Sequence, residues 1–369
     1  MIAVYGAAGS VGRRIAAALV DRGAEVRLVG RDRPRLLGVA DQLGLDLAVV
    51  RAAPTHDAVA LRAALAGAAV VVCAAGPIER IGATVAAAAL DVGAHYLDVT
   101  IEPAMVRALY EEHESAARQR QRCVASGLGA VGALGDWAID LAAATLGAAP
   151  RLDGPPLDHA MVAYAFDGAR VATGMARSLV AALAGPALWW RHGRWDEVPA
   201  AARGRTLAFG ALGPRRARAL ATAEAVSVPR RWPVRQLDTW VAPTGAPWLD
   251  RAIGVAGPLL RWLPGVAATV EALVDPGRDP DDDAYHDARF AVVAHVGVGP
   301  RAVTVTVDGH DLYGTTAAIV SQLARGLADG AIAATGGCGP SQLLDGGRAL
   351  RATADLTVTV AESPGPDAG

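Results

Sequence analysis

The first 33 residues carry the feature that most restricts the fold of this chain. Residues 2–5 form a short apolar run, and residues 6–12, which read GAAGSVG, follow it at once. Apolar residues then recur at helical spacing over 11–20, and residues 25–29 form a second apolar run. This order of strand, glycine turn, helix and strand is typical of the first unit of a Rossmann fold, a doubly wound parallel α/β sheet.

The glycine turn predicts a binding site for a dinucleotide. Backbone N–H groups at the start of a helix attract negative charge, and side chains on Gly6 or Gly9 would keep a diphosphate away from them. A side chain on Gly12 would push the helix off the strand. The alternative is a turn whose glycines serve packing alone. The cofactor contacts expected here are Gly6, Ala8, Gly9, Ser10, Val11 and Gly12.

The end of the second strand indicates which nucleotide is bound. NAD sites usually have an acid about 20 residues after the motif, for the ribose hydroxyls. Here the strand is followed by Arg31, Asp32 and Arg33. The two arginines can pair with a 2′-phosphate, whereas Asp32 could instead cap a helix that begins near Pro34. We therefore expect NADP(H), with Arg31 as a contact; in the alternative both arginines are simply solvated.

The alternation of strand and helix patterns continues to about residue 127 and predicts six parallel strands. The buried run 69–74 ends in a turn at the carboxyl edge of the sheet, where doubly wound folds bind nucleotides. The cofactor contacts expected there are Ala74, Ala75, Gly76 and Pro77. The other expected strands are 47–50, 95–98 and 122–126, and the expected helices are 34–43, 58–66, 82–92 and 105–119.

The pattern then changes to a mixed α+β region, so we expect a second domain. The expected strands are 157–166, a hairpin over 189–198 that turns at His192-Gly193, 225–228, 237–242, a hairpin over 289–295 and 302–307, and 352–360; the expected helices are 137–146, 173–184 and 315–328, with a turn at 336–340. The predicted domains are 1–127, which binds NADP; 128–310, for substrate and dimerisation; 311–362, a C-terminal helix and strand that return towards the domain interface; and 363–369, a disordered tail.

Composition excludes several classes of protein. All 35 basic residues are arginine, so there is no lysine for a Schiff base, a P-loop or a Tyr-x-x-x-Lys pair. A net charge of −2 argues against a nucleic-acid partner. Cys73, Cys123 and Cys338 are odd in number and widely spaced, which indicates a reducing, cytoplasmic location, and no Cys/His spacing predicts a metal site.

One apolar segment has two interpretations. No run reaches the roughly 18 uninterrupted apolar residues of a membrane span, but 248–274 contains two apolar helical patterns. They could cover a sheet or the interface of a homodimer. Alternatively they could line the site of a lipid-like substrate or make a peripheral membrane contact. The acidic stretch 275–287 that follows is expected to be a solvated loop.

Four segments resemble the saccharopine dehydrogenase-like NADP-binding oxidoreductases, in particular the branch of trans-acting enoyl reductases. The first is the glycine turn together with Val29-Gly30-Arg31, and the second is residues 71–77. The third and most specific is 93–102, GAHYLDVTIE, where the family pattern is G-x-H-Y-x-D-x-T-G-E and Ile101 replaces a glycine. The fourth is 311–317. Residues 127–136 depart from the family pattern and keep only Gly127 and Asp136, which puts the family's substrate in doubt more than its cofactor.

The third segment also carries the candidate chemistry. Hydride transfer needs a group that supplies a proton or a hydrogen bond where negative charge grows. The segment offers an imidazole, a phenol, two carboxylates and a hydroxyl. In the alternative, His95 and Asp98 are structural hydrogen bonders and Glu102 caps the next helix. The candidate catalytic residues are Tyr96, Asp98 and His95, with Thr100 as a further cofactor contact; weaker proton-donor candidates, each more typical of a structural role, are Tyr164, Tyr285, His286 and Tyr313.

The expected function is reduction of a C=C or C=N bond of a sizeable apolar small molecule by NADP(H). The resemblance to enoyl reductases implies C=C, and that to saccharopine-type enzymes implies C=N. Two rivals remain at this point. The divergent stretch 127–136 favours a catalytically silent NADP-binding or interaction protein, and 248–274 would suit a membrane-surface protein.

Overall fold

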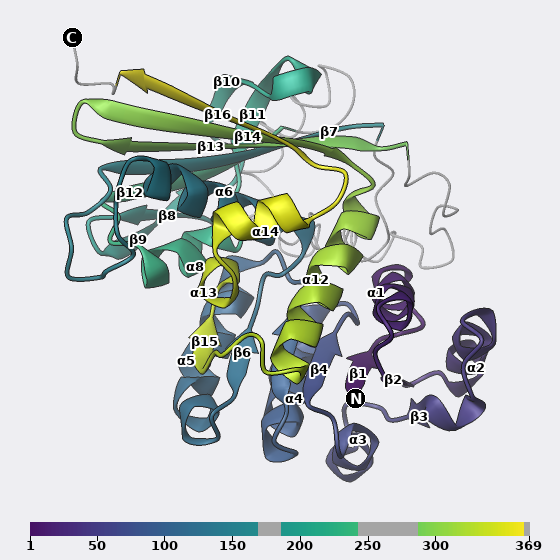
Figure 1. Ribbon diagram of the computed structural model, residues 1–369. Coiled ribbons are helices and arrows are strands. Elements are labelled where there is room, and N and C mark those ends of the chain that lie inside the picture. The colour runs from purple at the N-terminus through teal and green to yellow at the C-terminus, as the bar shows by residue number, and fades with distance from the viewer. Residues whose placement is uncertain (169–185, 243–286, 365–369) are drawn as a thin grey trace. The chain divides into compact units, whose positions relative to one another are not determined.

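The computed structural model describes residues 1–168, 186–242 and 287–364, and the chain divides into two compact units (Figure 1). The first unit consists of Met1–Ala130 and Tyr313–Leu344, and the second of Val131–Leu312 and Asp345–Gly369. Each unit is therefore built from two pieces of chain. The region expected over 311–362 is shared between them.

The described part of the first unit contains one sheet of seven strands, in the order β15-β6-β5-β4-β1-β2-β3. All neighbours are parallel, and β1 lies between β4 and β2, so the predicted Rossmann-type α/β fold is confirmed. The strands are β1 Ile2–Tyr5, β2 Val26–Gly30, β3 Val50–Ala52, β4 Val70–Cys73, β5 His95–Asp98, β6 Cys123–Ala125 and β15 Gly336–Cys338.

The helices of the first unit follow the expected alternation. They are α1 Ser10–Asp21, α2 Arg33–Gln42, α3 Ala58–Leu65, α4 Ile78–Asp91, α5 Pro103–Gln119, α12 Leu312–Ala328 and the short α13 Pro340–Leu343. In Figure 1, α12 runs beside α1; accordingly, a Cβ added to Gly23 after α1 would lie 3.9 Å from Arg325 of α12.

Two predictions in this unit were wrong. Residues 47–50 were expected to be a strand, but Leu47–Val49 form a 3-10 helix, η1, which Asp46 caps through the N–H of Ala48. The turn expected at 336–340 is the seventh strand, β15, which pairs with β6. A Cβ on Gly337 would come 2.8 Å from the ring of Tyr110 of α5. The glycine that suggested a turn is therefore needed so that this edge strand can pack against α5.

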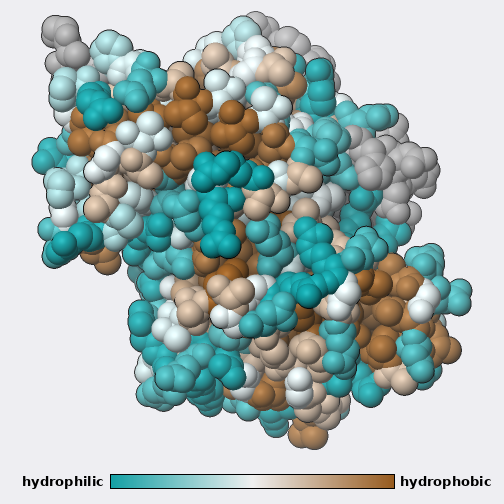
Figure 2. Space-filling model, in the orientation of Figure 1, coloured by the Kyte–Doolittle hydropathy of each residue, from teal (hydrophilic) through white to brown (hydrophobic). Residues whose placement is uncertain are grey.

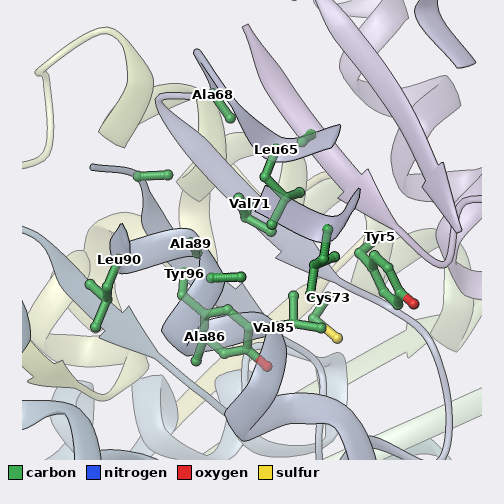
Figure 3. Packing of buried hydrophobic residues seen from close by; sticks show 14 of the residues in the cluster. Tyr5, Leu65, Ala68, Val71, Cys73, Val85, Ala86, Ala89, Leu90 and Tyr96 are labelled. Atoms are coloured by element: carbon green, nitrogen blue, oxygen red, sulfur yellow. The ribbon is translucent and has the colours of Figure 1, made fainter. Parts of the chain in front are cut away.

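One hydrophobic core of this unit lies between the sheet and the helices on the side of α3 and α4. Figure 3 shows Val85, Ala86, Ala89 and Leu90 of α4 together with Val71 and Cys73 of β4 and Tyr96 of β5. Small alanines on α4 let the helix approach the strands closely. The carboxyl ends of β1, β4 and β5 are thereby held in fixed register, which is what positions the turns that follow them.

The described part of the second unit contains a nine-stranded mixed sheet. Its main path is β10-β11-β12-β7-β13-β14-β16, and β8 and β9 attach beside β12. The strands are β7 His159–Asp167, β8 Pro186–Arg191, β9 Arg194–Pro199, β10 Gly204–Ala208, β11 Pro214–Ala219, β12 Gln236–Ala242, β13 Arg289–Val298, β14 Arg301–His310 and β16 Thr357–Pro364; the helices are α6 Ala130–Thr145, η2 Gly210–Leu212, α8 Glu224–Arg231 and α14 Gly346–Ala352.

Both hairpins predicted in this unit are present. The β8–β9 hairpin turns at His192 and Gly193. Their φ angles are 48° and 86°, and positive values at both positions are typical of a two-residue hairpin loop. The β13–β14 hairpin turns at Gly299-Pro300. The predicted strand at 225–228 is wrong because these residues belong to α8. The last strand begins at Thr357 instead of 352, and it includes Ser363 and Pro364 of the predicted tail, which pair with β14.

Several predictions lie outside the described residues. These are the helix at 173–184, the apolar segment 248–274 and most of the acidic stretch 275–287. Among the described helices, none combines the length and the apolar character that crossing a membrane requires. Figure 2 shows hydrophobic residues gathered over α2 and its surroundings, where Leu47 of η1 is 54% exposed. The strand order ends at β3 on this side, so this surface belongs to the open edge of the sheet.

Candidate functional site

The glycine turn is shaped by two close approaches of the backbone. Gly6 has a φ of +88°, and a Cβ there would lie 2.5 Å from the backbone nitrogen of Ala75. A Cβ on Gly12 would collide with the carbonyl oxygen of Gly6. Both glycines are therefore required by the fold itself, and the packing interpretation holds for them in addition to any role toward a ligand.

Gly9 differs from these two glycines. It is the N-cap residue of α1, with no side-chain hydrogen bond at the cap, and a Cβ there would lie 3.4 Å from the Gly6 oxygen, which is ordinary contact. The fold does not need a glycine here. A glycine at the N-cap places no side chain over the first turn of α1, which suits a diphosphate at a helix N-terminus. The expected contacts Ala8, Ser10 and Val11 are half-buried around this point.

The second predicted turn lies against the first. The N–H of Ala74 donates to the carbonyl oxygen of Tyr5 at 2.9 Å, which aligns the ends of β4 and β1. Ala74, Ala75 and Pro77 are half-buried and Gly76 is exposed. The structure thus brings together two turns that the sequence separates, at the carboxyl edge where a parallel α/β sheet binds its ligand.

The residues after β2 separate into a structural acid and three exposed arginines. Asp32 caps α2 by accepting from the N–H of Arg35 at 3.1 Å, which is the capping alternative considered for this acid. Arg31, Arg33 and Arg35 are exposed. One carboxylate oxygen of Asp32 is thus engaged in the cap, and the three arginines make the local charge positive.

Sequence reasoning did not identify Arg35 as part of this site. Its Nη2 donates to the carbonyl oxygen of Ala8 at 3.0 Å, so its side chain ties the start of α2 to the glycine turn. No spacing rule points to this contact, because it depends on how two successive loops meet at the sheet edge. Arg35 belongs to the candidate nucleotide site by position and charge.

The three candidate catalytic residues do not meet at one edge of the sheet: Asp98 ends β5 at the carboxyl edge, whereas the half-buried His95 begins β5 at the amino edge. His95 Nδ1 accepts from the N–H of Cys123 at 3.0 Å, and burial, followed by the nearby Arg122, lowers the pKa of His95 to about 4. Tyr96 is fully buried, and burial, with Asp98 and Cys73 nearby, raises the pKa of its phenol. Within the described residues, no hydrogen-bond partner satisfies the Tyr96 hydroxyl.

Asp98 connects the ends of two neighbouring strands. Its Oδ1 accepts from the N–H of Thr100 at 3.0 Å and of Gly127 at 3.3 Å, and both its oxygens lie within 2.9 Å of the Ser126 hydroxyl. Burial raises its pKa to about 6, although these hydrogen bonds act in the opposite direction. Asp98 therefore fixes the loops after β5 and β6, and these contacts are those of a structural hydrogen bonder. Its catalytic role stays a prediction.

Thr100 and Glu102 form a second, smaller link in the same loop. The Thr100 hydroxyl donates to Glu102 Oε2, and the N–H of Ile101 donates to the same oxygen at 3.2 Å. Glu102 is the N-cap residue of α5, but its side chain makes no capping hydrogen bond. Thr100 is buried, so its predicted contact with a cofactor is left as a prediction.

The divergent glycine stretch surrounds a buried acid in the second unit. Gly132, at a kink in α6 with a φ of +116°, donates its N–H to the Tyr164 hydroxyl at 3.0 Å, and Tyr164 donates to Glu224 Oε1. A Cβ on Gly135 would collide with both side chains. Burial raises the pKa of Glu224 to about 7. Asp136, one of the two residues kept from the family pattern, lies inside α6 and accepts from the Ser227 hydroxyl.

A known family of domains matches most of the first unit. Residues 2–131 match the model of a family described as the saccharopine dehydrogenase NADP binding domain. The chain matches no curated protein. This family match covers the glycine turn, the arginines after β2, the turn after β4 and the segment 93–102, so it covers the whole candidate site and gives NADP(H) as the cofactor.

Two solved structures cover nearly the whole chain. Apo saccharopine dehydrogenase (L-Glu forming) from Saccharomyces cerevisiae is 14% identical over 98% of this chain and 99% of its own, with a TM-score of 0.62. UDP-N-acetylglucosamine 3-dehydrogenase from Acidithiobacillus ferrooxidans is 12% identical over 95% and 96%, with a TM-score of 0.41. At these identities the first likeness shows the fold alone, and the second is too distant for any argument.

Proposed function

We propose that this chain, whose residues 2–131 are a saccharopine dehydrogenase-type NADP-binding domain, reduces a C=C or C=N bond of a sizeable apolar small molecule with NADPH. The oxidoreductase class and the cofactor come from the family match. The bond and the kind of substrate are finer statements, supported by the resemblance of four sequence segments to enoyl reductases and saccharopine-type enzymes.

One observation carries the proposal: the glycine N-cap of α1, in a turn that packs against the turn after β4. Gly9 puts no side chain over the first turn of the helix, and Gly6 lets the Ala75 backbone approach. These residues fit a diphosphate, which needs room and positive partial charge. Arg31 and Arg35 would hold the 2′-phosphate that distinguishes NADP(H) from NAD(H). When bound, NADPH supplies a hydride.

The chain's own contribution to the reaction is position. Asp98 joins the loops after β5 and β6 at the edge where the acceptor would have to lie. We propose that Asp98 acts there as a positioning residue, since its hydrogen bonds hold the loops of this edge in place. Tyr96 would support it from the core, whereas His95 lies at the opposite end of β5 and is not part of this edge. Because the hydride comes from the cofactor, the protein lowers the activation barrier of such reactions largely by positioning the acceptor.

A second candidate function is NADP(H) binding without turnover. The observation that favours it is that Tyr96 and Asp98 are fully buried, so neither offers a proton donor at the surface of the first unit. Binding would then serve an interaction or a sensing role. This alternative makes the same prediction for cofactor affinity and a different one for cofactor oxidation.

A substrate panel separates the two functions. Loss of the NADPH absorbance is followed with the full chain and either α,β-unsaturated carbonyl compounds or mixtures of an amine and an aldehyde that form imines. Turnover with one class supports the reductase and identifies the bond. Tight NADPH binding with no turnover in either class, relative to a no-protein control, supports the silent binding protein. The membrane-surface alternative rests on 248–274, which lies outside the described residues.

A further inference from the structure

We propose that one face of the second unit's sheet binds the oxyanion of a small molecule, a phosphate or a carboxylate. We call the side chains concerned the arginine face. They belong to the second unit, whereas the candidate NADP(H) site described above lies in the first unit. The members of the arginine face are Arg191, Arg203, Arg205, Trp189, Trp240, His159 and His295.

The strand register places the arginines and Trp240 on the same side of the sheet. Arg205 of β10 is opposite Ala217 of β11, and Ala219, two residues further along β11, is opposite Trp240 of β12. Residues two apart in a strand share a face, so Arg203 precedes Arg205 on this side. These side chains therefore project in one direction from three adjacent strands.

The same reasoning brings in the tryptophan of β8 and the two histidines. Gln236, which shares the face of Trp240 along β12, is opposite Arg191 of β8, and Trp189 lies two residues before Arg191. In the other direction Asp238 of β12 is opposite Met161, which is opposite His295 of β13. His159 lies two residues before Met161, and its ring centroid is 6.3 Å from that of His295.

Guanidinium groups stack on the indole rings of this face. Arg191 and Arg203 lie 4.9 Å and 4.7 Å from the ring centroid of Trp189, and Arg205 lies 5.6 Å from that of Trp240. Stacking holds a guanidinium in place through its plane and leaves the N–H groups at its edge able to donate. Preformed arginines of this kind suit an oxyanion.

The acids on this face are already engaged. Asp238 accepts from Trp240 Nε1 at 2.7 Å, and it lies 3.1 Å from His159 Nε2 and 3.6 Å from Arg191. Asp196, opposite Trp189 on β9, pairs with Arg194 at 3.2 Å. No carboxylate among the described residues lies within ion-pair distance of Arg203 or Arg205, both of which are exposed. Within that part of the chain, the face thus carries uncompensated positive charge.

A second, independent observation concerns a buried hydrogen-bond donor of this face. The side chain of Trp189 is 4% exposed, and its Nε1–H has no hydrogen-bond partner among the described residues. A buried N–H without an acceptor costs free energy, and an oxyanion oxygen is an acceptor. The pKa of His295 is lowered by burial and then by His159 and Arg205, so a bound anion would also relieve the repulsion between these groups.

The test follows two signals of the arginine face by NMR in the full chain saturated with NADP⁺. Inorganic phosphate and, in a separate arm, acetate are titrated while the His295 ring and the Trp189 indole N–H are observed. Phosphate or acetate is expected to shift the indole signal saturably and to raise the pKa of His295. In the double variant Arg203→Ala/Arg205→Ala we expect an affinity at least about tenfold lower.

Arg301→Ala is the matched control, because Arg301 is 54% exposed on the same sheet and pairs with Glu362 at 3.2 Å, but lies on the opposite face from His295 and its partner Thr304. It should keep the affinity within about twofold. The relative response to phosphate and acetate identifies which oxyanion the face prefers. Absence of a saturable shift with both anions, or an equal affinity in the double variant, would overturn the proposal. Because both signals come from the second unit, either result is independent of whether the first unit turns over NADPH.

Discussion

The backbone nitrogen of Ala75 lies 2.5 Å from the place where a side chain on Gly6 would begin. The turn after β1 and the turn after β4 are thus in direct contact, although the sequence presents them as separate motifs. This contact explains why one of the glycines is needed for folding, whatever the cofactor does. It also separates the glycines into two groups with different expected phenotypes.

Gly6→Ala should destabilise the protein. The substituted residue would keep a φ of +88° and would collide with Ala75, so we expect a loss of about 2–4 kcal/mol in the free energy of unfolding. Urea unfolding measures it. Gly38→Ala is the control, because a Cβ there meets nothing within 4 Å and Gly38 lies within the helix α2. Equal stability of the Gly6 variant and the wild type would show that the two turns do not meet as closely as described.

Gly9→Ala should have the opposite combination of effects. The added Cβ has room in the fold, at 3.4 Å from the nearest atom, so stability should change by less than about 1 kcal/mol. The methyl group would stand over the first turn of α1, and NADPH affinity should fall about tenfold or more. Calorimetric titration with NADPH, alongside urea unfolding, tests both statements. A variant that binds NADPH as the wild type does would remove Gly9 from the site.

Arg31→Ala and Arg35→Ala should each reduce the preference for NADPH over NADH. Both guanidinium groups are exposed near the glycine turn, and a charge-assisted contact with a phosphate contributes about 1.5–3 kcal/mol. We therefore expect the ratio of the two affinities to fall about tenfold, through weaker NADPH binding and unchanged NADH binding. Arg62→Ala, on α3 beside Asp91, is the control. Equal losses for both cofactors would mean that neither arginine contacts the 2′-phosphate.

Stability should fall as pH rises through the range set by Glu224. Burial raises its pKa from 4.5 to about 7, so between these values the folded state keeps a proton that the unfolded state has lost. The free energy of unfolding should decrease between pH 4.5 and 7 by up to roughly 3 kcal/mol. Glu224→Gln should remove this contribution to the pH dependence of stability. The contribution of Asp98, whose pKa is raised from 3.8 to about 6, remains in both proteins. The readout is urea unfolding at several pH values; a constant difference between variant and wild type contradicts it.

The nucleotide-binding half of the fold follows from local sequence patterns. Strands β1, β2, β4 and β6 are short, mostly apolar runs, and each is followed by a turn or a helix start that the residue types specify, such as Asp32 before Pro34. Such signals do not depend on distant parts of the chain. Strand β3 is not an apolar run, and the strand predicted there was wrong. Strand β15 is a further exception. Its sequence is typical of a turn, but its glycines are needed because a side chain there would collide with the Tyr110 ring.

The second unit and the site were harder to predict for the same physical reason. Residues 225–228 alternate like a strand, yet they form part of α8, whose Glu224 and Ser227 are held by Tyr164 and Asp136 from other elements. Arg35 enters the site through a contact between loops. Tyr96 and Asp98 were selected by residue type, and only packing shows that they are buried. Tertiary contacts decide all three cases.

Everything proposed for the first unit depends on NADP(H) binding at the glycine turn before α1 and the arginines after β2. Calorimetric titration of the full, unmodified chain with NADPH and with NADH measures this binding without any assumption about the substrate. We expect NADPH to bind at least about tenfold tighter than NADH, in line with one or two charge-assisted contacts to the 2′-phosphate. Equal or tighter binding of NADH, or no binding of either cofactor, would contradict this assignment.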